Sequence, residues 1–195
     1  MSEYHALLMK TVIVIGGGLA GLQAGVFTAK AGEETLVLDT GESLVLNTSN
    51  IQNLIGHDSV AGNELLKKGK EKLKNFDGEI KEEKVEEVEE TGECFKVITE
   101  DDDYETEYLV AASAGDLSYL ENLVKFEDGV EGPYMMERHV KTSQHNQSTE
   151  NKKIFAAGLA NTWEYQTSVA IGDGAKAAVN LLTELRGEPF EDHDT

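Results

Sequence analysis

Residues 11–39, TVIVIGGGLAGLQAGVFTAKAGEETLVLD, decide the fold of this chain. Residues 11–15 form a short β-branched run that ends at three glycines, which is typical of a strand buried on both faces. Residues 19–31 follow with the small residues of a helix that packs closely on a sheet, and Gly32 is placed to end that helix. Residues 35–39 form the next strand. Together they predict a βαβ unit, whose crossover predicts a parallel sheet with the first strand at its centre.

Three glycines, Gly16, Gly18 and Gly21, join the first strand to the helix, and Asp39 ends the second strand. This spacing and context match the dinucleotide-binding fingerprint. Such glycines permit a tight turn, a close approach of the backbone to a pyrophosphate, and close packing of helix on strand, while the helix N-terminus attracts phosphates. Asp39 would accept hydrogen bonds from an adenosine ribose. We therefore expect a bound adenine dinucleotide, and the alternative is a tight glycine turn without a ligand.

The rest of the chain adds helices and an antiparallel unit. Residues 63–75 predict an amphipathic surface helix. Residues 84–108 contain three alternating segments separated by turn residues, which predict a three-stranded antiparallel meander. Residues 109–114 are apolar and are expected to return to the main sheet. Residues 153–157 predict a last buried strand, and residues 165–185 predict a long helix.

These elements predict an α/β fold of the Rossmann-like FAD/NAD(P)-binding class, doubly wound, with a parallel sheet, helices and a three-stranded antiparallel meander. Residues 115–150 carry one short predicted helix, over residues 117–125, and no legible function. We find no linker that would divide two domains. Residues 1–195 are therefore expected to form a single domain, with an acidic mobile tail from about residue 188 to residue 195.

Composition restricts the function classes. The chain has 17 basic and 37 acidic residues and a net charge of −20, so nucleic-acid and anionic-membrane binding are disfavoured. Its single cysteine, Cys94, excludes an internal disulfide, a CxxC pair and a cysteine zinc site. The absence of a signal-peptide pattern and of an apolar run near about 20 residues predicts a cytoplasmic protein. The acidity favours a halophilic protein, with an acidic mesophilic protein as the alternative.

Several single residues invite a role. His57, His139 and His145 have no metal-ligand spacing, so we expect solvated loop positions and no metal site, with His57 near a cofactor as the alternative. Cys94 is expected to be a small buried hydrophobic residue, with a reactive thiol as the alternative. The aromatic residues at positions 163 and 165 are expected to pack in a core or interface, with stacking on a cofactor as the alternative.

Three blocks of the sequence resemble a known family in collinear order. They are VIVIGGGLAGLQAGVFTAKAGEETLVLD (residues 12–39), IQNLIGHDSVAGNELL (residues 51–66) and IFAAGLANTWEYQTSVAIGDGAKAA (residues 154–178). They resemble the thioredoxin-reductase-like pyridine nucleotide–disulfide oxidoreductases, in which these blocks build the FAD domain. The resemblance implies FAD as the cofactor.

By this resemblance, the three fingerprint glycines would take the FAD pyrophosphate and Asp39 the adenosine ribose. Asn53 would lie near the flavin, Val85 would present its backbone to the adenine, and Gly158 would approach the ribityl chain. Gln166, Thr167 and Ser168 would face the flavin ring from a helix N-terminus. The candidate cofactor-binding residues are Gly16, Gly18, Leu19, Ala20, Gly21, Asp39, Asn53, Val85, Ala112, Gly158, Leu159, Gln166, Thr167 and Ser168.

The chain departs from the family pattern in three places. Leu159 stands where the family has an aspartate, which removes one ribityl hydrogen bond. Residues 111–113 (AAS) replace an Ala-Thr-Gly turn. Only about 40 residues separate Ser113 from the strand at Lys153, where the family inserts an NAD(P)H-binding domain. Without that domain and a cysteine pair, the family mechanism of thioredoxin reductase is excluded.

The remaining interpretation is a FAD-binding flavoprotein, an oxidoreductase or electron carrier whose donor arrives as a small molecule or on a partner protein. The alternative is a non-catalytic FAD- or NAD-binding sensor or scaffold, and a third interpretation is a nucleotide fold that serves only in dimerisation. The surface exposed by the absent domain predicts a homodimer or a partner complex. No catalytic residue is assigned from the sequence.

Overall fold

A parallel sheet forms the centre of the computed structural model, which describes residues 8–130 and 136–192. Its strands run in the order β3-β2-β1-β6-β9. The strand bounds are Leu8–Ile15 for β1, Thr35–Asp39 for β2, Glu79–Glu82 for β3, Asp103–Ala111 for β6 and Ile154–Ala156 for β9. The predicted parallel sheet is thus confirmed, and β1 is its middle strand.

β1 owes its central place to its β-branched run. Val12, Ile13 and Val14 are fully buried, because β2 and β6 pair with the two edges of β1 and apolar layers cover both of its faces. The strand begins at Leu8, three residues before the predicted start. The β1–α1–β2 unit agrees with the prediction from residues 11–39.

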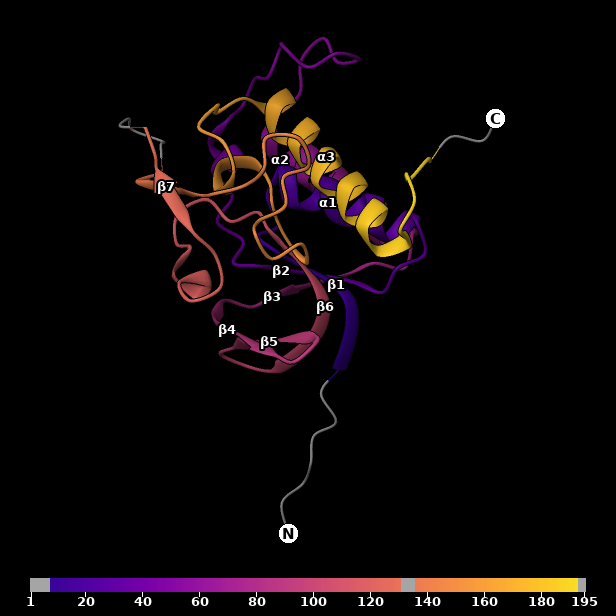
Figure 1. Cartoon of the computed structure of the whole chain (residues 1–195). Helices are drawn as coiled ribbons and strands as arrows, with labels where there is room; N and C mark the ends of the chain where they lie inside the picture. Colours follow the sequence, from indigo (N-terminus) through magenta and orange to yellow (C-terminus); the bar gives the residue numbers. More distant parts are fainter. Residues whose placement is uncertain (1–7, 131–135, 193–195) are drawn as a thin grey trace.

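The helices gather on one face of the sheet (Figure 1). They are α1 (Leu19–Lys30), α2 (Gly62–Asn75) and α3 (Thr167–Arg186). α1 lies close to α3 because glycines remove side chains at the contact: a Cβ on Gly174 would lie 2.0 Å from the carbonyl oxygen of Ala20. The amphipathic helix predicted over residues 63–75 is α2, whose Leu66 and Leu73 are buried. Among the described residues no helix is long and apolar enough to cross a bilayer.

The other face is covered by an antiparallel meander, as the sequence predicts. β4 (Val85–Thr91) pairs with β5 (Cys94–Thr99), and β5 pairs with the first half of β6. The meander and the return to the main sheet share one strand, β6. The second half of β6 pairs with β9 on the edge where β5 has ended. The helices and the meander therefore cover opposite faces, and the helices do not divide between the two faces as the doubly wound arrangement would have them.

The segment between β6 and β9, residues 114–152, is here called the connector. Its predicted helix over residues 117–125 is wrong: only the 3-10 turn η2 (Ser118–Leu120) forms there. The following residues extend instead into β7 (Phe126–Asp128), which pairs with β8 (Arg138–Val140) in a separate two-stranded sheet. Tertiary pairing has overridden a weak local helix preference. The edge strand β3 was also not predicted, because its EIKE sequence is only half buried.

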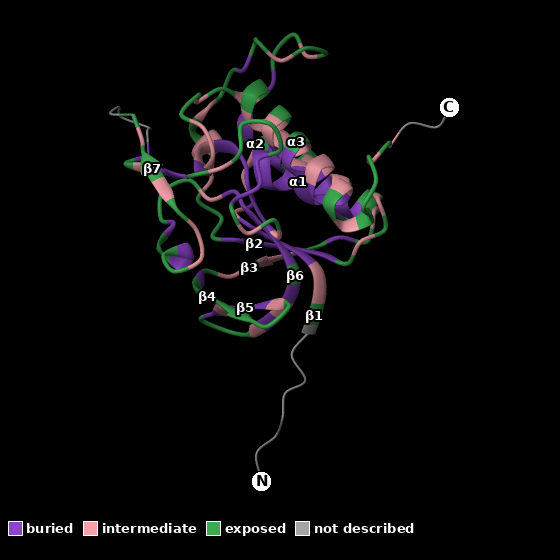
Figure 2. Ribbon diagram, viewed as in Figure 1, coloured by how far each residue is buried: buried purple, intermediate pink, exposed green. Residues whose placement is uncertain are grey.

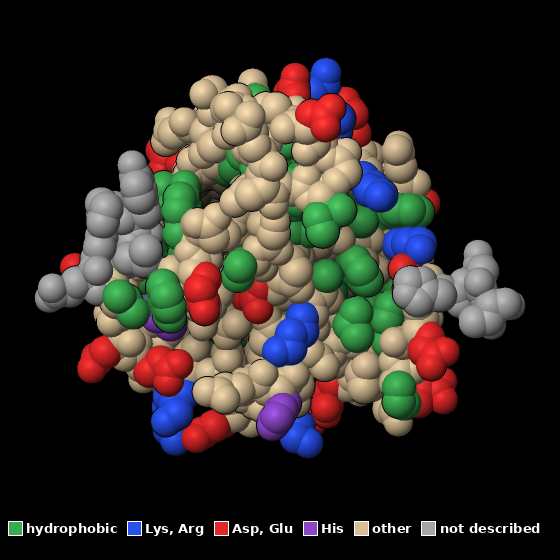
Figure 3. All heavy atoms as spheres, turned by 90° about the horizontal axis from the view of Figure 1, so that it is seen from above, with side chains coloured by type: hydrophobic (Ala, Val, Ile, Leu, Met, Phe, Trp, Pro, Cys, Tyr) green, Lys and Arg blue, Asp and Glu red, His purple; other side chains and the backbone are tan. Residues whose placement is uncertain are grey.

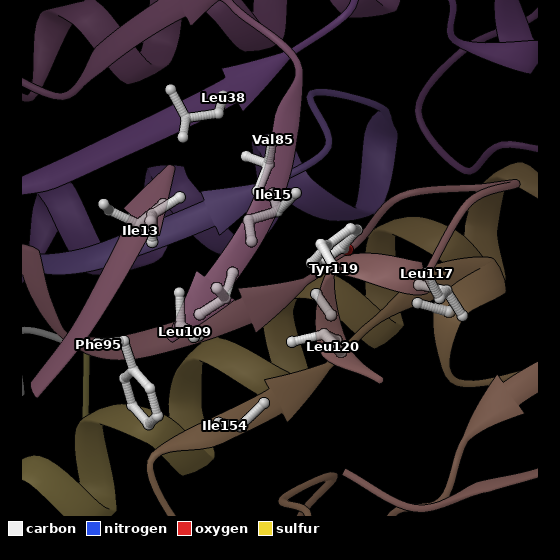
Figure 4. Close-up of a cluster of buried hydrophobic side chains, with 14 of the residues drawn as sticks. Ile13, Ile15, Leu38, Val85, Phe95, Leu109, Leu117, Tyr119, Leu120 and Ile154 are labelled. Atoms are coloured by element: carbon white, nitrogen blue, oxygen red, sulfur yellow. The ribbon is translucent and has the colours of Figure 1, made fainter. Parts of the chain in front are cut away.

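Two apolar cores pack against the two faces of the sheet. Figure 2 shows the buried residues along the central strands and on the helices beside them. One core lies between the sheet and the helices. The other joins the sheet to the meander and to η2, where Tyr119 and Leu120 point toward Ile15 and Leu109 (Figure 4). The connector thus contributes to the core. On the face seen from above, hydrophobic side chains form separate groups, and acidic side chains lie around the edge and also between these groups (Figure 3).

Candidate nucleotide-binding site

A cavity of about 850 Å³ opens at the carboxyl ends of β1, β2 and β6, beside the N-termini of α1 and α3. Its volume lies within the range of about 300–1,000 Å³ that small-molecule sites occupy. Consecutive backbone hydrogen bonds join the strand ends at its base: Gly16 N to Leu38 O, Ala112 N to Ile15 O, and Ala157 N to Ala111 O, each 2.8 Å. The base of the cavity is therefore formed by strand ends that are hydrogen-bonded to one another through their backbones.

Most of the candidate cofactor-binding residues line this cavity. Those that do are Gly16, Gly18, Leu19, Ala20, Asp39, Asn53, Val85, Ala112, Gly158, Leu159, Gln166 and Thr167. The other two, Gly21 and Ser168, are not among the lining residues. The structure therefore brings together segments that are up to about 150 residues apart in the chain.

The fingerprint glycines divide into packing positions and a surface position. Gly16 has φ +107°, and a Cβ there would lie 2.7 Å from the backbone of Ala112. A Cβ on Gly21 would lie 1.8 Å from the carbonyl oxygen of Gly16. Gly18, in contrast, has only Ser43 Oγ within 4 Å of an added Cβ, at 3.4 Å, and it faces the cavity. A side chain at Gly18 would thus occupy space in the cavity without a backbone clash.

Asp39 supports the glycine loop from below. Its Oδ1 accepts a 2.9 Å hydrogen bond from the backbone N–H of Gly17, and its Oδ2 lies 3.5 Å from Lys70 Nζ on α2. Asp39 is buried and lines the cavity. One carboxylate oxygen is thus committed to the loop, and the other balances Lys70 of α2.

Two helix N-termini meet at the cavity. Gly18 is the N-cap of α1 and Gln166 is the N-cap of α3, and neither helix has a side-chain cap hydrogen bond. Neither helix has an acidic residue in its first turn. The N–H groups of each first turn therefore remain available for a ligand, and the positive ends of both helix dipoles favour negative charge in the cavity.

The segment around Asn53 is held against the start of α3. Asn53 Nδ2 donates to Gln166 Oε1 at 3.1 Å, and Ser168 Oγ donates to the carbonyl oxygen of Asn53 at 3.2 Å. Ser168 therefore fixes the cavity rim from outside rather than facing the cavity. Asn53 and Gln166 remain in the lining and close one end of the cavity.

The turn after β9, η3 (Gly158–Ala160), forms another wall. Gly158 has φ +62°, and a Cβ there would lie 2.7 Å from the Cβ of Ala20 on α1. Its N–H donates to Asp173 Oδ2 at 2.7 Å, while the carbonyl oxygen of Leu159 accepts from His139 Nδ1 at 2.8 Å. This wall is therefore anchored at two consecutive residues, and Leu159 contributes an apolar surface.

Sequence reasoning missed several residues of the cavity. Ser43 faces Gly18, and Ser113 Oγ is 2.7 Å from the hydroxyl of Tyr119, which also lines the cavity. Burial raises the pKa of Tyr119 well above its usual range, so this hydroxyl stays protonated. Ser43 could have been predicted from the sequence, because it follows Asp39 by only four residues. Tyr119 could not, because its place depends on how the connector packs.

The lining carries more carboxylates than cations. Its acidic residues are Asp39, Glu42, Glu83, Asp116 and Glu164, and Lys84 is its basic residue. Glu83 is already engaged, since it accepts hydrogen bonds from the hydroxyl groups of Tyr104 and Thr99. Phosphate groups bound here would therefore be held by backbone N–H groups rather than by lysine or arginine side chains.

Several sequence expectations need correction. His139 is buried in β8 and not in a solvated loop, because its ring reaches the carbonyl of Leu159. Cys94 is half-buried at the start of β5 and not in the core. Trp163 is half exposed and lies outside the cavity lining, whereas Tyr165 belongs to the lining. His57 is half-buried; among the described residues no cluster of three metal-ligand side chains occurs.

Comparisons with known proteins agree with this geometry. Thioredoxin reductase of Bacillus subtilis (strain 168) is 39% identical over 70 residues, which are 35% of this chain and 22% of that protein. The chain spans about a quarter of the length of the curated relatives it matches. The structure of a thioredoxin reductase from Gloeobacter violaceus superposes with a TM-score of 0.79 at 15% identity, over 96% of this chain and 98% of that chain.

A ferredoxin-flavin thioredoxin reductase from Clostridium acetobutylicum gives a TM-score of 0.74 at 17% identity, over 92% of this chain and 98% of that chain. These structures share the fold of a Rossmann-like FAD-binding domain. The family model described as pyridine nucleotide-disulphide oxidoreductase matches residues 10–120, more than half of the chain. The chain therefore belongs to the pyridine nucleotide-disulphide oxidoreductase family and has the FAD-binding fold of thioredoxin reductases.

Proposed function

We propose that the chain binds FAD in this cavity and acts as a flavoprotein oxidoreductase or electron carrier. The observation that carries the proposal is the meeting of two uncapped helix N-termini, those of α1 and α3, at one cavity of about 850 Å³. One N-terminus suits a pyrophosphate and the other suits a flavin ring that becomes negative on reduction. A site for a mononucleotide alone would not need the second.

The residues support an extended pose. The fingerprint loop with Gly16 and Gly18 would hold the pyrophosphate, and Asp39 with the backbone of Val85 would hold the adenosine. Gly158, which lines the cavity, would approach the ribityl chain. Gln166 and Thr167 would place the flavin ring. Bound FAD would supply hydride and electron transfer at that ring.

This chain's own residues would bind, orient and shield. The first-turn N–H groups of α3 would donate to the ring edge and stabilise negative charge there. Leu159 would exclude water from the ribityl region, and Asn53 would hold the rim through its bond to Gln166. None of these groups moves a proton, so we assign the chain a binding and electrostatic role.

A dithiol relay within this chain is not part of the proposal. Cys94 is the single cysteine of the sequence, and it lies on β5 outside the cavity lining. The connector forms a small two-stranded sheet where the family pattern leads one to expect an NAD(P)H-binding domain. Electrons would therefore come from a small molecule or from a partner protein. A homodimer is a further part of this proposal, and sedimentation velocity at high salt tests it.

A second candidate function is a non-catalytic sensor or scaffold that binds FAD or NAD. Two observations favour it: Leu159 makes part of the cavity wall apolar, and the five lining carboxylates weaken affinity for an anionic cofactor. The sensor would bind the nucleotide without turnover of a reduced nicotinamide or of a partner.

The deciding experiment is an absorption spectrum of the purified protein in high salt, followed by denaturation and identification of the released small molecule. A flavin spectrum with released FAD supports the proposal. A colourless protein that takes up no FAD on incubation contradicts it. Turnover of NADH, NADPH or a reduced electron-transfer protein with an artificial acceptor then separates an oxidoreductase from a sensor.

A further inference from the structure

Three side chains of the connector form hydrogen bonds with the η3 wall of the cavity or with residues that contact this wall. His139 donates to the carbonyl of Leu159, and Thr142 Oγ1 donates to Asn161 Oδ1 at 2.6 Å. Gln147 Nε2 donates to the Asp173 carboxylate, and also to the Asp173 carbonyl oxygen at 3.2 Å. The connector therefore holds one wall of the cavity that it does not itself form.

Asp173 is the centre of this network. Its carboxylate accepts from the N–H of Gly158 at 2.7 Å and from Asn161 Nδ2 at 3.1 and 3.2 Å, in addition to Gln147. Three donors from two segments, the turn after β9 and the connector, thus converge on one largely buried carboxylate. Burial nevertheless raises the pKa of Asp173 above its ordinary value. The ionised form of this buried carboxylate therefore depends on these hydrogen bonds for its stabilisation.

Gln147 is placed for this contact. It has φ +55°, a conformation that side-chain-bearing residues seldom adopt, and it is almost completely buried. Strained backbone of this kind persists where the surroundings determine it. The Gln147 side chain lies between the connector and α3, with its amide on Asp173.

We infer that Asp173 is a positioning residue of the cofactor cavity: it fixes the N–H of Gly158, and thereby the turn that presents Leu159, while Gln147 of the connector holds Asp173 in place. This inference rests on the proposed FAD site. A carboxylate can accept all three bonds at once only when it is ionised, because protonation turns one acceptor oxygen into a donor. Cofactor binding should therefore weaken as pH falls through the pKa of Asp173.

Other charged or titratable groups lie near Asp173 and bear on the pH dependence of this site. Lys176, on the next turn of α3, favours the ionised carboxylate, and Glu164, in the segment before α3, opposes it. His139 reaches the same turn from β8 through the carbonyl of Leu159. Each pH profile of an Asp173 variant is therefore compared with that of a control variant in which Asp173 is unchanged.

The first test is the affinity for FAD, measured by fluorescence titration of the cofactor-free protein at neutral pH and at about pH 5. Asp173→Asn is expected to raise the FAD dissociation constant about tenfold at neutral pH and to remove most of its pH dependence. Gln147→Gly, which suits the positive φ, should weaken binding in the same direction. Glu184→Gln changes an exposed carboxylate on α3 to an amide and should leave both values unchanged.

The second test uses no cofactor. In protein labelled with ¹⁵N-glycine, the assigned amide proton of Gly158 should titrate with Asp173, and Asp173→Asn should abolish that titration while Glu184→Gln preserves it. The inference is overturned if the wild type and Asp173→Asn have the same FAD dissociation constant at both pH values. Wild-type protein that binds no FAD overturns the proposed function instead, and the Gly158 amide then decides whether Asp173 fixes the turn.

Discussion

The backbone N–H of Gly17 donates a 2.9 Å hydrogen bond to the carboxylate of Asp39, 22 residues later in the chain. The two residues are in close contact, since a Cβ on Gly17 would lie 2.5 Å from the Asp39 Cγ. The acidic residue at the end of β2 therefore shapes the glycine loop before any ligand arrives. Recognition of a ribose by Asp39 would add to this structural role.

Asp39→Ala should accordingly destabilise the protein even without a cofactor. The substitution leaves the buried N–H of Gly17 without its acceptor, which costs about 2 kcal/mol of unfolding free energy. Urea unfolding of the cofactor-free variant measures this loss. Asp58→Ala, at an exposed loop position, is the matched control and should unfold like the wild type. Equal stability of both variants would show that the Gly17 bond contributes nothing.

Gly18→Val should abolish FAD retention and leave the fold intact. Gly18 has ordinary backbone geometry, with φ −70°, and the nearest atom to an added Cβ is Ser43 Oγ at 3.4 Å. The new side chain would fill the space proposed for the pyrophosphate. Bound flavin after purification and the melting temperature are the two measurements. Gly172→Val, where an added Cβ meets nothing within 4 Å, should keep its flavin.

Gly21→Ala gives the opposite result. Its Cβ would lie 1.8 Å from the carbonyl oxygen of Gly16, so α1 would have to move away from β1. Such overpacking costs about 3 kcal/mol. The loss should appear in the unfolding free energy of the cofactor-free protein, whereas Gly18→Val should show none. Similar stabilities for the two variants would contradict this division of the fingerprint.

Leu159→Asp should tighten FAD binding. Leu159 lines the cavity at the wall assigned to the ribityl chain, and a carboxylate there would accept a hydrogen bond from a ribityl hydroxyl. We expect the FAD dissociation constant to fall about tenfold. Leu159→Ala, which removes the side chain without adding an acceptor, is the control and should give no gain. An unchanged constant for Leu159→Asp would mean that the cofactor lies in another pose.

Stability should depend on pH in opposite ways through two carboxylates. Burial raises the pKa of Asp173, so its stabilising contribution is present at low pH and is lost as pH rises through its native pKa. Hydrogen bonds from Ser118 lower the pKa of Asp116, so its contribution is present at higher pH and is lost on acidification. The slope of melting temperature against pH in the acidic range should therefore differ from that of the wild type in opposite directions for Asp173→Asn and Asp116→Asn. Parallel curves for the two variants would refute the assignment.

The part of the site that sequence could predict is the part encoded by local backbone needs. Gly16 and Gly21 lie at positions that backbone geometry or close packing reserves for glycine, so the glycine spacing predicted the loop. The buried run of β1 and the termination of α1 near Gly32 were equally local. The late block around Gly158 was found through its resemblance to a family rather than from residue patterns.

The rest depended on tertiary contacts. β3 is an exposed edge strand with a weak pattern, and β7 forms only because β8 lies beside it. The sequence predicted a solvated loop position for His139, and only the packing of the connector against η3 buries it. Asp173 lies in a helical sequence with no sign of its partners, because all three of its side-chain hydrogen-bond donors come from outside α3.

The shared strand β6 has a consequence for how a ligand enters. β5 and β9 add to successive halves of one edge of β6, while β1 pairs along its other edge. The glycine loop that follows β1 and the turn that follows β9 are thus joined through one continuous strand, and they cannot separate without breaking the sheet. Any adjustment of the cavity to a ligand would therefore fall to the lining loops at residues 40–53 and 164–166. Substitutions in these loops are expected to change the association rate, while the sheet remains rigid.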